Sequence, residues 1–188
     1  MGTTGESMDT QAPATILIEP FRPEHVGQVV RLIVGIQQNE FNLPITAKDQ
    51  PDLQDIPEFY QVKNGNFWVA LQESRVVGTI ALLDIGNRTG ALRKMFVNAR
   101  CRGKETGTAK KLLDALLAWA ARKEFTAIYL GTTPKFLAAH AFYERNGFQE
   151  VAKSDLPSAF PIMKVDTKFY AYKVNTRQHK EESCRSSM

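Results

Sequence analysis

A strand, a helix and a second strand follow one another in the middle of the sequence, and this order restricts the possible fold more than any other feature. Residues 91–97 form a strand-like segment, residues 106–122 place leucine and alanine at helical spacing, and residues 127–130 form a compact apolar strand. A strand–helix–strand connection within one sheet joins parallel strands by a right-handed crossover. The sequence therefore predicts a parallel strand pair with a helix packed across it.

The segments on either side predict antiparallel strands and further helices. The link Glu73–Arg75 between two strand-like segments is typical of a hairpin, and Thr133-Pro134 is a helix start signal. Strands are expected at residues 15–19, 67–72, 76–84, 148–151 and 168–174, and helices from Pro23, at 52–62 with an acidic cap, and from 133 to 145. This order predicts a mixed α/β sheet with helices on both faces.

One domain accounts for most of the 188 residues. Its body is expected over residues 14–175, and the polar segments 1–13 and 176–188 are expected to be disordered. The sequence lacks an apolar run of the roughly 20 residues that cross a bilayer, and its N-terminus lacks the regions of a signal peptide. We therefore expect a cytoplasmic protein without a membrane partner. The two cysteines and three histidines lack ligand spacing, so a metal site is not expected.

A basic loop between the strand at 91–97 and the following helix is the strongest candidate for a binding site. Residues 93–111 contain seven basic residues and one acid, Glu105, a net charge of +6 where the whole chain has +4. The helix N-terminus adds unpaired backbone N–H groups and a partial positive charge. Gly103 and Gly107 permit a tight turn and the close approach of a ligand. These features predict an anion site.

Blander interpretations of this loop stay open: a solvated basic face, or an ordinary turn that contains glycine. The phosphate-binding patterns G-x-x-x-x-G-K-[ST] and G-x-G-x-x-G are absent from it. Nucleic-acid binding is disfavoured because aromatic residues, apart from Phe96, do not alternate with the basic ones, so no stacking surface is indicated. A polyphosphate ligand is the better match.

Two sequence motifs resemble those of the GNAT acetyltransferase family. Residues 102–109, Arg-Gly-Lys-Glu-Thr-Gly-Thr-Ala, are similar to the acyl-CoA signature R/Q-x-x-G-x-G/A, with Glu105 in place of the middle glycine. Residues 138–148 are similar to the family's A-x-x-(F/L)-Y-x-x-x-G-F helix and turn. Glu105 suits a helix N-terminus and is expected to point to solvent. The two motifs occur in the right order, separated by a helix and a strand, and together they extend the similarity over about residues 15–174.

The resemblance implies the GNAT fold, in which a mainly antiparallel twisted sheet contains a central, splayed pair of parallel strands. It also implies acetyl-CoA as acyl donor, an amine as acceptor, and Tyr143 as the general acid that protonates the departing thiolate. Ala139 lies one helical turn before Tyr143 and leaves room for the pantetheine arm. The resemblance assigns cofactor contacts to Met95, Phe96, Val97, Arg102, Gly103, Lys104, Glu105, Thr106, Gly107, Thr108, Phe136 and Ala139. Phe136 stands where family members often carry an asparagine.

The acceptor and the general base stay undecided at the level of sequence. The candidate bases are Glu40, Asp52, Asp55, Glu58 and Asp84, and the candidate wall residues are Phe41, Phe59, Tyr60, Phe160 and Tyr170. His140 is interpreted as a residue of the helix surface. A homodimer is possible. The alternative to an N-acetyltransferase is a regulatory module that binds acyl-CoA without turnover, which the departures at Glu105 and Phe136 would explain.

Overall fold

A computed structural model describes residues 15–134 and 136–175, so the two predicted disordered tails lie outside the described residues. The strands are β1 (Leu17–Pro20), β2 (Asn66–Gln72), β3 (Arg75–Asp84), β4 (Thr89–Val97), β5 (Ala127–Thr132), β6 (Gln149–Val151) and β7 (Lys168–Lys173). The α-helices are α1 (Val26–Asn39), α2 (Ile56–Tyr60), α3 (Thr108–Arg122) and α4 (Leu137–Arg145). Short 3-10 turns are η1 (Pro23–His25), η2 (Ala47–Asp49), η3 (Pro51–Leu53), η4 (Ala99–Cys101) and η5 (Lys153–Asp155).

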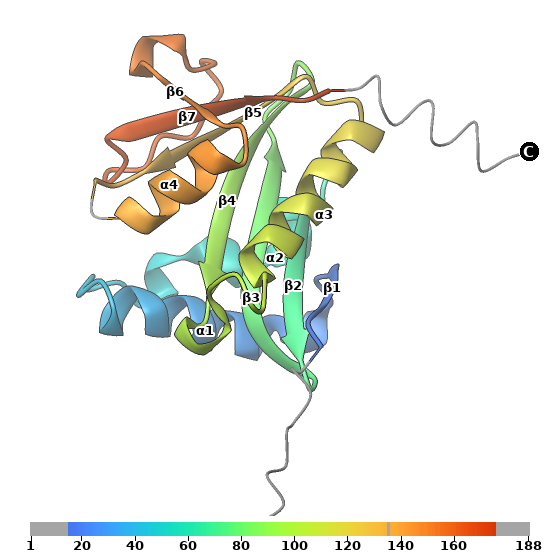
Figure 1. The fold of residues 1–188 in the computed structure, drawn as a ribbon, viewed down its shortest axis with the longest axis vertical. Coiled ribbons are helices and arrows are strands. Elements are labelled where there is room, and N and C mark those ends of the chain that lie inside the picture. The colour runs from blue at the N-terminus through green and yellow to red at the C-terminus, as the bar shows by residue number, and fades with distance from the viewer. Residues whose placement is uncertain (1–14, 135, 176–188) are drawn as a thin grey trace, which may run out of the picture.

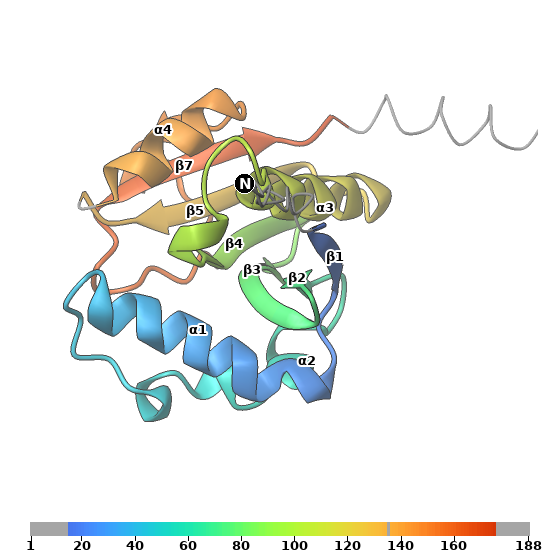
Figure 2. The same ribbon diagram turned by 60° about the horizontal axis from the view of Figure 1, so that its bottom comes forward.

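The strands form one mixed sheet in the order β1-β2-β3-β4-β5-β7-β6. Neighbouring strands are antiparallel except for β4 and β5, the pair joined by the crossover helix α3. Helices α3 and α4 cover one face of the sheet, and α1 and α2 cover the other (Figures 1 and 2). The predicted fold is confirmed.

Apolar faces of the helices account for the two main core layers. On α3, Leu112, Leu113 and Leu116 are fully buried and pack with side chains from the sheet, as their helical spacing predicted. On α1, Val29 and Ile33 are fully buried against the opposite face. Burying one such side chain stabilises the fold by about 1.5–3 kcal/mol. Both layers therefore fix the middle of the sheet, where β4 lies.

Strand β4 contains a bulge that changes the direction of its side chains. Thr79 of β3 pairs with Phe96 and Ala81 pairs with Arg93, so that one residue of β3 faces both Lys94 and Met95. Lys94 has a φ of 51°, and its carbonyl accepts a hydrogen bond from Thr79 Oγ1 at 2.7 Å. Bulges of this kind bend a strand and aim side chains in new directions.

Three predicted helix boundaries are wrong. The helix expected at residues 52–62 is a 3-10 turn followed by the short α2, because the Asp55 side chain caps a new start by accepting from Glu58 N–H. The helix expected from Thr133 begins at Leu137. Helix α3 begins at Thr108 and not at residue 106, because Gly107 adopts the left-handed conformation before it. The other elements match their predicted ranges to within a few residues.

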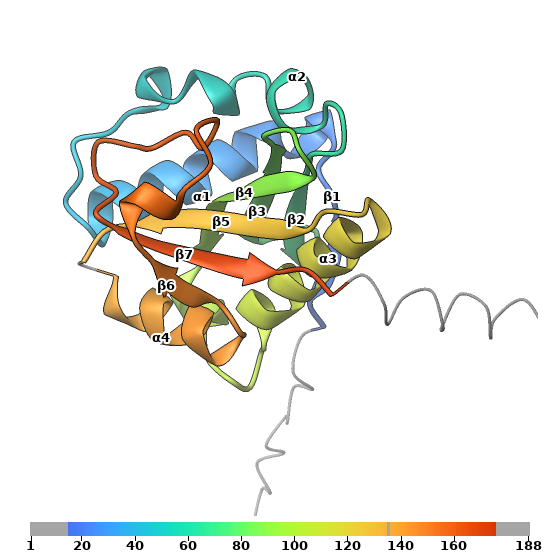
Figure 3. The same cartoon turned by 90° about the horizontal axis from the view of Figure 1, so that it is seen from above.

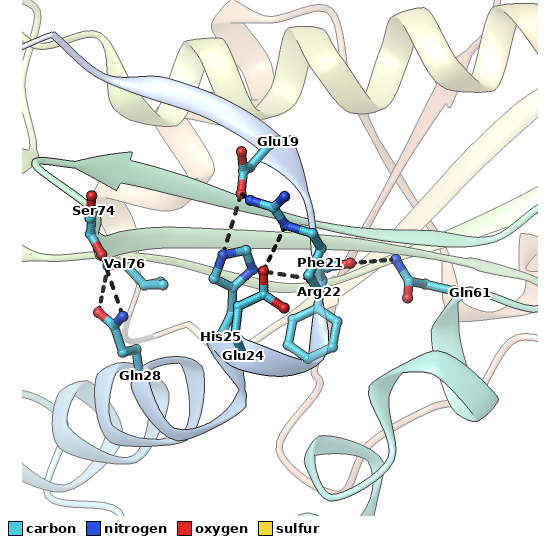
Figure 4. A network of polar contacts seen from close by, with 9 residues as sticks. All are labelled: Glu19, Phe21, Arg22, Glu24, His25, Gln28, Gln61, Ser74 and Val76. Atoms are coloured by element: carbon cyan, nitrogen blue, oxygen red, sulfur yellow. Dashed lines mark hydrogen bonds and ion pairs between the residues drawn. The ribbon is translucent and has the colours of Figure 1, made fainter.

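A polar network ties the start of α1 to the edge of the sheet (Figure 4). Glu19 of β1 pairs with Arg22 at 2.6 Å and with the buried His25 at 3.3 Å. Farther along, Gln28 accepts a hydrogen bond from Val76 N–H at 2.9 Å. These contacts fix the N-terminal end of α1. Its other end lies near the cavity between β4 and β5 that is described below.

Within the described ranges, no helix is long and apolar enough to cross a bilayer. The same residues contain no group of three or more histidine, cysteine or acidic side chains placed to hold a metal ion.

Candidate active site

Strands β4 and β5 separate after a short paired stretch, and a cavity of about 150 Å³ lies where they diverge. Their ladder joins Thr89–Ala91 to Ala127–Tyr129, and beyond it the two strands run apart (Figure 1). The cavity is lined by Leu92, Arg93, Lys94, Met95, Phe96, Leu130, Gly131, Thr132, Thr133, Phe136, Ala139, Tyr143, Phe160, Met163, Val165 and Asp166. It therefore joins β4, β5, α4 and the connection between β6 and β7.

The edge of β4 that faces β5 forms one wall of this cavity. From Leu92 onward β4 has no partner on that side among the described pairs, whereas its other edge pairs with β3 as far as Val97. Backbone groups along an unpaired edge can bind an extended ligand as an added strand would. Met95 and Phe96, to which the family resemblance assigns cofactor contacts, lie on this edge and line the cavity.

Tyr143 approaches the cavity from α4 on the opposite side. Its ring is 7% exposed and packs against Phe148 and Tyr170. Its hydroxyl donates a hydrogen bond to the sulfur of Met95 at 3.4 Å. Burial raises the pKa of Tyr143, because the phenolate would lose its hydration. The phenol therefore keeps its proton at neutral pH and faces β4 across the cavity.

The predicted anion loop has the backbone shape that its glycines suggested. Gly103 and Gly107 have φ values of 102° and 60°, which only glycine adopts readily. Helix α3 begins without a side-chain cap, and the buried Thr108 Oγ1 has no hydrogen-bond partner within the described structure. Glu105 is exposed, as expected. Helix N–H groups and an unpartnered buried hydroxyl are suited to an anion.

Arg102, the basic residue of the signature, forms an ion pair and a hydrogen bond within the chain. Its guanidinium forms a two-point ion pair with Glu40 at the end of α1, at 2.7 and 2.9 Å, and its Nε donates to the carbonyl of Val97 at 2.7 Å. No local sequence pattern indicates this pairing, because the two charged residues lie far apart along the chain. The loop residues 102–108 and Val97 lie outside the cavity lining.

Phe41, which follows Glu40 at the end of α1, contacts a residue of the cavity wall. Phe41 packs on Phe136, which precedes α4, with ring centroids 4.2 Å apart. Phe136 lines the cavity, so the aromatic residue that replaces the family's asparagine contributes to its wall. Ala139 lines the cavity as well. The end of α1 thus contacts both sides of the opening between β4 and β5, through Glu40 on one and Phe41 on the other.

The five acids considered from sequence have other roles or positions. Glu40 pairs with Arg102, Asp55 caps α2, and Glu58 is exposed. Asp84 accepts backbone hydrogen bonds from Asn64 and Gly86. None of them lines the cavity.

Asp52, the remaining acid, belongs to a buried network beside β4. It pairs with Lys94 at 3.0 Å and accepts the Tyr60 hydroxyl at 2.5 Å, and Lys94 also donates to Gln50 at 2.7 Å. Burial lowers the pKa of Lys94, although the nearby Asp52 carboxylate opposes this effect. This network fixes the bulge of β4.

Besides Lys94, two charged residues that sequence reasoning missed as site residues line the cavity. Arg93 of β4 donates to the sulfur of Met163 at 3.3 Å. Asp166, from the β6–β7 connection, is the single acid in the cavity lining among the described residues. Their basic or acidic character is visible in the sequence, but neither stands in a motif. Only the register of β4 and the course of a long loop bring them together.

Other sequence interpretations have mixed outcomes. Phe160 lines the cavity, while Tyr60 and Tyr170 are fully buried core residues and Phe59 is partly exposed, outside the cavity lining. His140 is not on the helix surface: it is 7% exposed, and its Nε2 lies 3.0 Å from the Thr133 carbonyl. The Tyr170 ring also lies beside the His140 ring, with centroids 6.0 Å apart.

A model of the acetyltransferase (GNAT) family matches residues 31–148, more than half of the chain. The chain belongs to the GNAT family. A GNAT acetyltransferase from Staphylococcus aureus Mu50 is 39% identical and superposes with a TM-score of 0.81, covering 86% of this chain and 100% of that one. An acetyltransferase from Streptococcus agalactiae 2603 is 33% identical with a TM-score of 0.79, over 84% and 98% of the two chains.

Curated relatives match a smaller part of this GNAT chain than the two solved structures do. N-acetylaspartate synthetase from Xenopus tropicalis is 40% identical over 104 residues, which are 53% of this chain and 37% of that protein. The chain therefore spans little more than a third of the length of this relative. The match supports an N-acetyltransferase domain.

Proposed function

We propose that this chain transfers acetyl from acetyl-CoA to a primary amine by direct attack, with Tyr143 as general acid. The observation that carries the proposal is the cavity between the splayed strands, with the Tyr143 phenol on one wall and the unpaired edge of β4 on the other. A thioester held along β4 would present its sulfur between these walls.

The described residues fit the cosubstrate at both of its ends. The pantetheine arm would bind along β4 at Met95, Phe96 and Val97, which have no partner strand on the β5 side among the described pairs. The pyrophosphate would bind the α3 N-terminus and the turn 103–108, where the buried Thr108 hydroxyl has no partner within the described structure. The small Ala139 and the ring of Phe136 bound the space between.

The reaction that these residues support has two bond changes. The neutral amine nitrogen attacks the thioester carbonyl carbon, and a backbone N–H of β4 stabilises the resulting oxyanion. The carbon–sulfur bond then breaks, and the departing sulfur takes the proton of the Tyr143 phenol. The nitrogen loses one proton, which leaves the amide and free CoA. A phenol that stays protonated at neutral pH can perform this step at every turnover, once solvent has returned its proton.

The acceptor that we propose to test first is an amino acid. The relatives named N-acetylaspartate synthetase are named for the acetylation of an amino acid. In this chain Arg93 lines the cavity with only a methionine sulfur shown as its hydrogen-bond acceptor among the described residues. Sulfur is a weak acceptor, and a carboxylate would replace it with a charge-assisted, two-point contact. An acceptor with an α-carboxylate therefore suits the wall.

Substitution of Tyr143 by Phe tests the general acid. We expect kcat to fall about 10²-fold, with the dissociation constant for acetyl-CoA changed less than threefold, because the ring still fills its place. Thiol release in the presence of an amino-acid panel measures the first quantity and calorimetry the second. Tyr172→Phe is the matched control, since Tyr172 packs on Phe148 but does not line the cavity. Equal kcat values for the two variants would remove Tyr143 from the mechanism.

The alternative function, an acyl-CoA-binding module without turnover, draws on the ion pair between Arg102 and Glu40 and on the charge of Glu105. Both weaken the case for a strong pyrophosphate contact. Binding of acetyl-CoA without acceptor-dependent thiol release, across amino acids and simple amines, would favour this module over the enzyme.

A further inference from the structure

An acceptor amine must lose a proton before it attacks, and the cavity contains one side chain suited to remove it. A free alkylamine has a pKa near 10.4, so nearly all of it is charged at neutral pH. The acids considered from sequence lie outside the cavity lining. Asp166 is the acid that remains among the described residues of the wall.

The carboxylate of Asp166 lies directly above the backbone of β5. A Cβ built on Gly131 would be 2.4 Å from Asp166 Oδ2 and 2.6 Å from its Cγ, so the acid occupies the space that the missing side chain leaves. Gly131 belongs to the part of β5 that has separated from β4. The carboxylate is therefore at the same divergence point as Tyr143 and Met95.

Backbone hydrogen bonds on both sides hold Asp166 in this place. Its Oδ2 accepts from Met163 N–H at 3.0 Å, and its own N–H donates to the Met163 carbonyl at 3.0 Å. The following residue, Thr167, donates to the carbonyl of Thr132 at 3.0 Å. The turn 163–166 is thus fastened to the end of β5, and the acid has a defined position in the wall.

The surroundings of Asp166 shift its proton affinity in the direction that a base needs. Burial raises the pKa of Asp166, while the Met163 N–H and the positive charge of Arg93 limit the rise. The other ionisable residues in the cavity wall are Arg93 and Lys94 of β4 and Tyr143 of α4, with Asp52 behind Lys94. The positive charge of Arg93 near the carboxylate also disfavours a second cation in this wall.

We propose that Asp166 is the general base of this acetyltransferase, a role that rests on the function proposed above. Its carboxylate takes one proton from the acceptor ammonium and leaves a neutral nitrogen whose lone pair attacks the thioester carbonyl. The carboxylic acid then returns its proton to solvent, directly or through water. With Tyr143 on the other wall, the cavity holds a base for the incoming nitrogen and an acid for the departing sulfur.

Substitution of Asp166 by Asn tests this role, because asparagine keeps the size of the side chain and can still accept from Met163 N–H. We expect kcat at pH 7 to fall about 10²–10³-fold, while the affinity for acetyl-CoA changes less than threefold. Asp155→Asn is the matched control: Asp155 stands in the same β6–β7 connection and also accepts a backbone N–H from three residues earlier, but it is exposed and outside the cavity. The control is expected to keep its kcat within twofold.

The pH profile separates a base from a residue that only supports the wall. In the Asp166→Asn variant the rate is expected to rise about tenfold per pH unit from pH 6 to 9, in proportion to the neutral fraction of an acceptor whose pKa is near 10. The loss should shrink below about tenfold for an acceptor amine whose pKa lies below the assay pH, since that amine needs no base. A structural defect would lower the rate equally for all amines at every pH.

A second variant tests the position of the carboxylate without changing its chemistry. Gly131→Ala places a methyl group 2.4 Å from Asp166 Oδ2, so the carboxylate must move. We expect this variant to reduce kcat at least tenfold, with the same steeper pH dependence. If Asp166→Asn retains the wild-type rate and pH profile while Tyr143→Phe lowers kcat, the base is wrong and the proposed function stands. If wild-type protein binds acetyl-CoA but turns over none of the acceptors, the proposed function and this inference both fail.

Discussion

The buried ion pair beside the β4 bulge allows a quantitative prediction of stability. Lys94 and Asp52 are 9% and 12% exposed, and the fully buried Tyr60 donates its hydroxyl to the same carboxylate oxygen. Asp52→Asn keeps an acceptor for Tyr60 but leaves Lys94 without its counter-charge. Removing one partner of a buried pair costs about 3–5 kcal/mol. We expect a loss near the lower end, about 3 kcal/mol, because Gln50 still accepts from Lys94 and the amine can give up its proton.

Urea unfolding with an unchanged m value measures this loss. The exposed pair Lys110–Asp114, with both side chains more than half exposed, provides the control: Asp114→Asn should change the unfolding free energy by about 0.5 kcal/mol or less. The double variant Asp52→Asn, Lys94→Met should lose at least about 1 kcal/mol less than the sum of its single variants, because the two residues interact directly. A loss below about 1 kcal/mol for Asp52→Asn, or additive losses, would refute this account of the network.

The same variant has a predicted pH dependence. Burial already lowers the pKa of Lys94 from 10.5, and Asp52 opposes that effect, so Asp52→Asn lowers it further. Below pH 10.5 the unfolded chain then binds a proton that the folded protein has lost, and stability increases with pH in that window. The deficit of the variant relative to wild type should therefore become smaller as pH is raised from 7 toward 10. A constant deficit would show that Lys94 is not the group responsible.

Three further results are expected. Glu40→Gln frees Arg102 from its partly exposed ion pair, and such pairs contribute up to about 1 kcal/mol. The affinity for acetyl-CoA, measured by calorimetry, should therefore rise by up to about fivefold. Weaker binding would mean that Glu40 supports the loop. Arg93→Gln should raise KM for an amino-acid acceptor at least tenfold but leave KM for a simple alkylamine within twofold, and equal changes would argue against a carboxylate contact. Burial raises the pKa of Tyr60 and Tyr143 above 10, so above pH 10 the folded protein keeps protons that the unfolded chain loses. The unfolding free energy should therefore fall above pH 10 by up to about 1.4 kcal/mol per pH unit for each tyrosine. The fall should be shallower in Tyr143→Phe.

Local sequence patterns were sufficient to predict the parallel crossover, the loop before its helix and the motif that follows its second strand. Helical spacing on α3 identified the buried leucines, and glycines at 103 and 107 identified the turn before that helix. Tyr143 and Ala139 were predicted from their place in a motif and do line the cavity. Local patterns identify such features because they depend on periodicity and on backbone conformations that glycine alone adopts readily.

Contacts between charged residues could not be predicted from the sequence. In a regular strand Arg93 and Lys94 would point to opposite faces of the sheet. The bulge instead turns Lys94 toward Asp52 and Gln50, on the face that α2 covers. Arg93 pairs with Ala81, which belongs to the core layer on that same face, so both basic side chains lie on one side of the sheet. Asp166 reaches Gly131 only because the β6–β7 connection returns over the sheet on the side of α1 and α2 (Figure 3). Glu40 reaches Arg102 from the far end of α1. These contacts join segments that are distant in sequence, and their geometry depends on strand register and loop course, which no local pattern encodes.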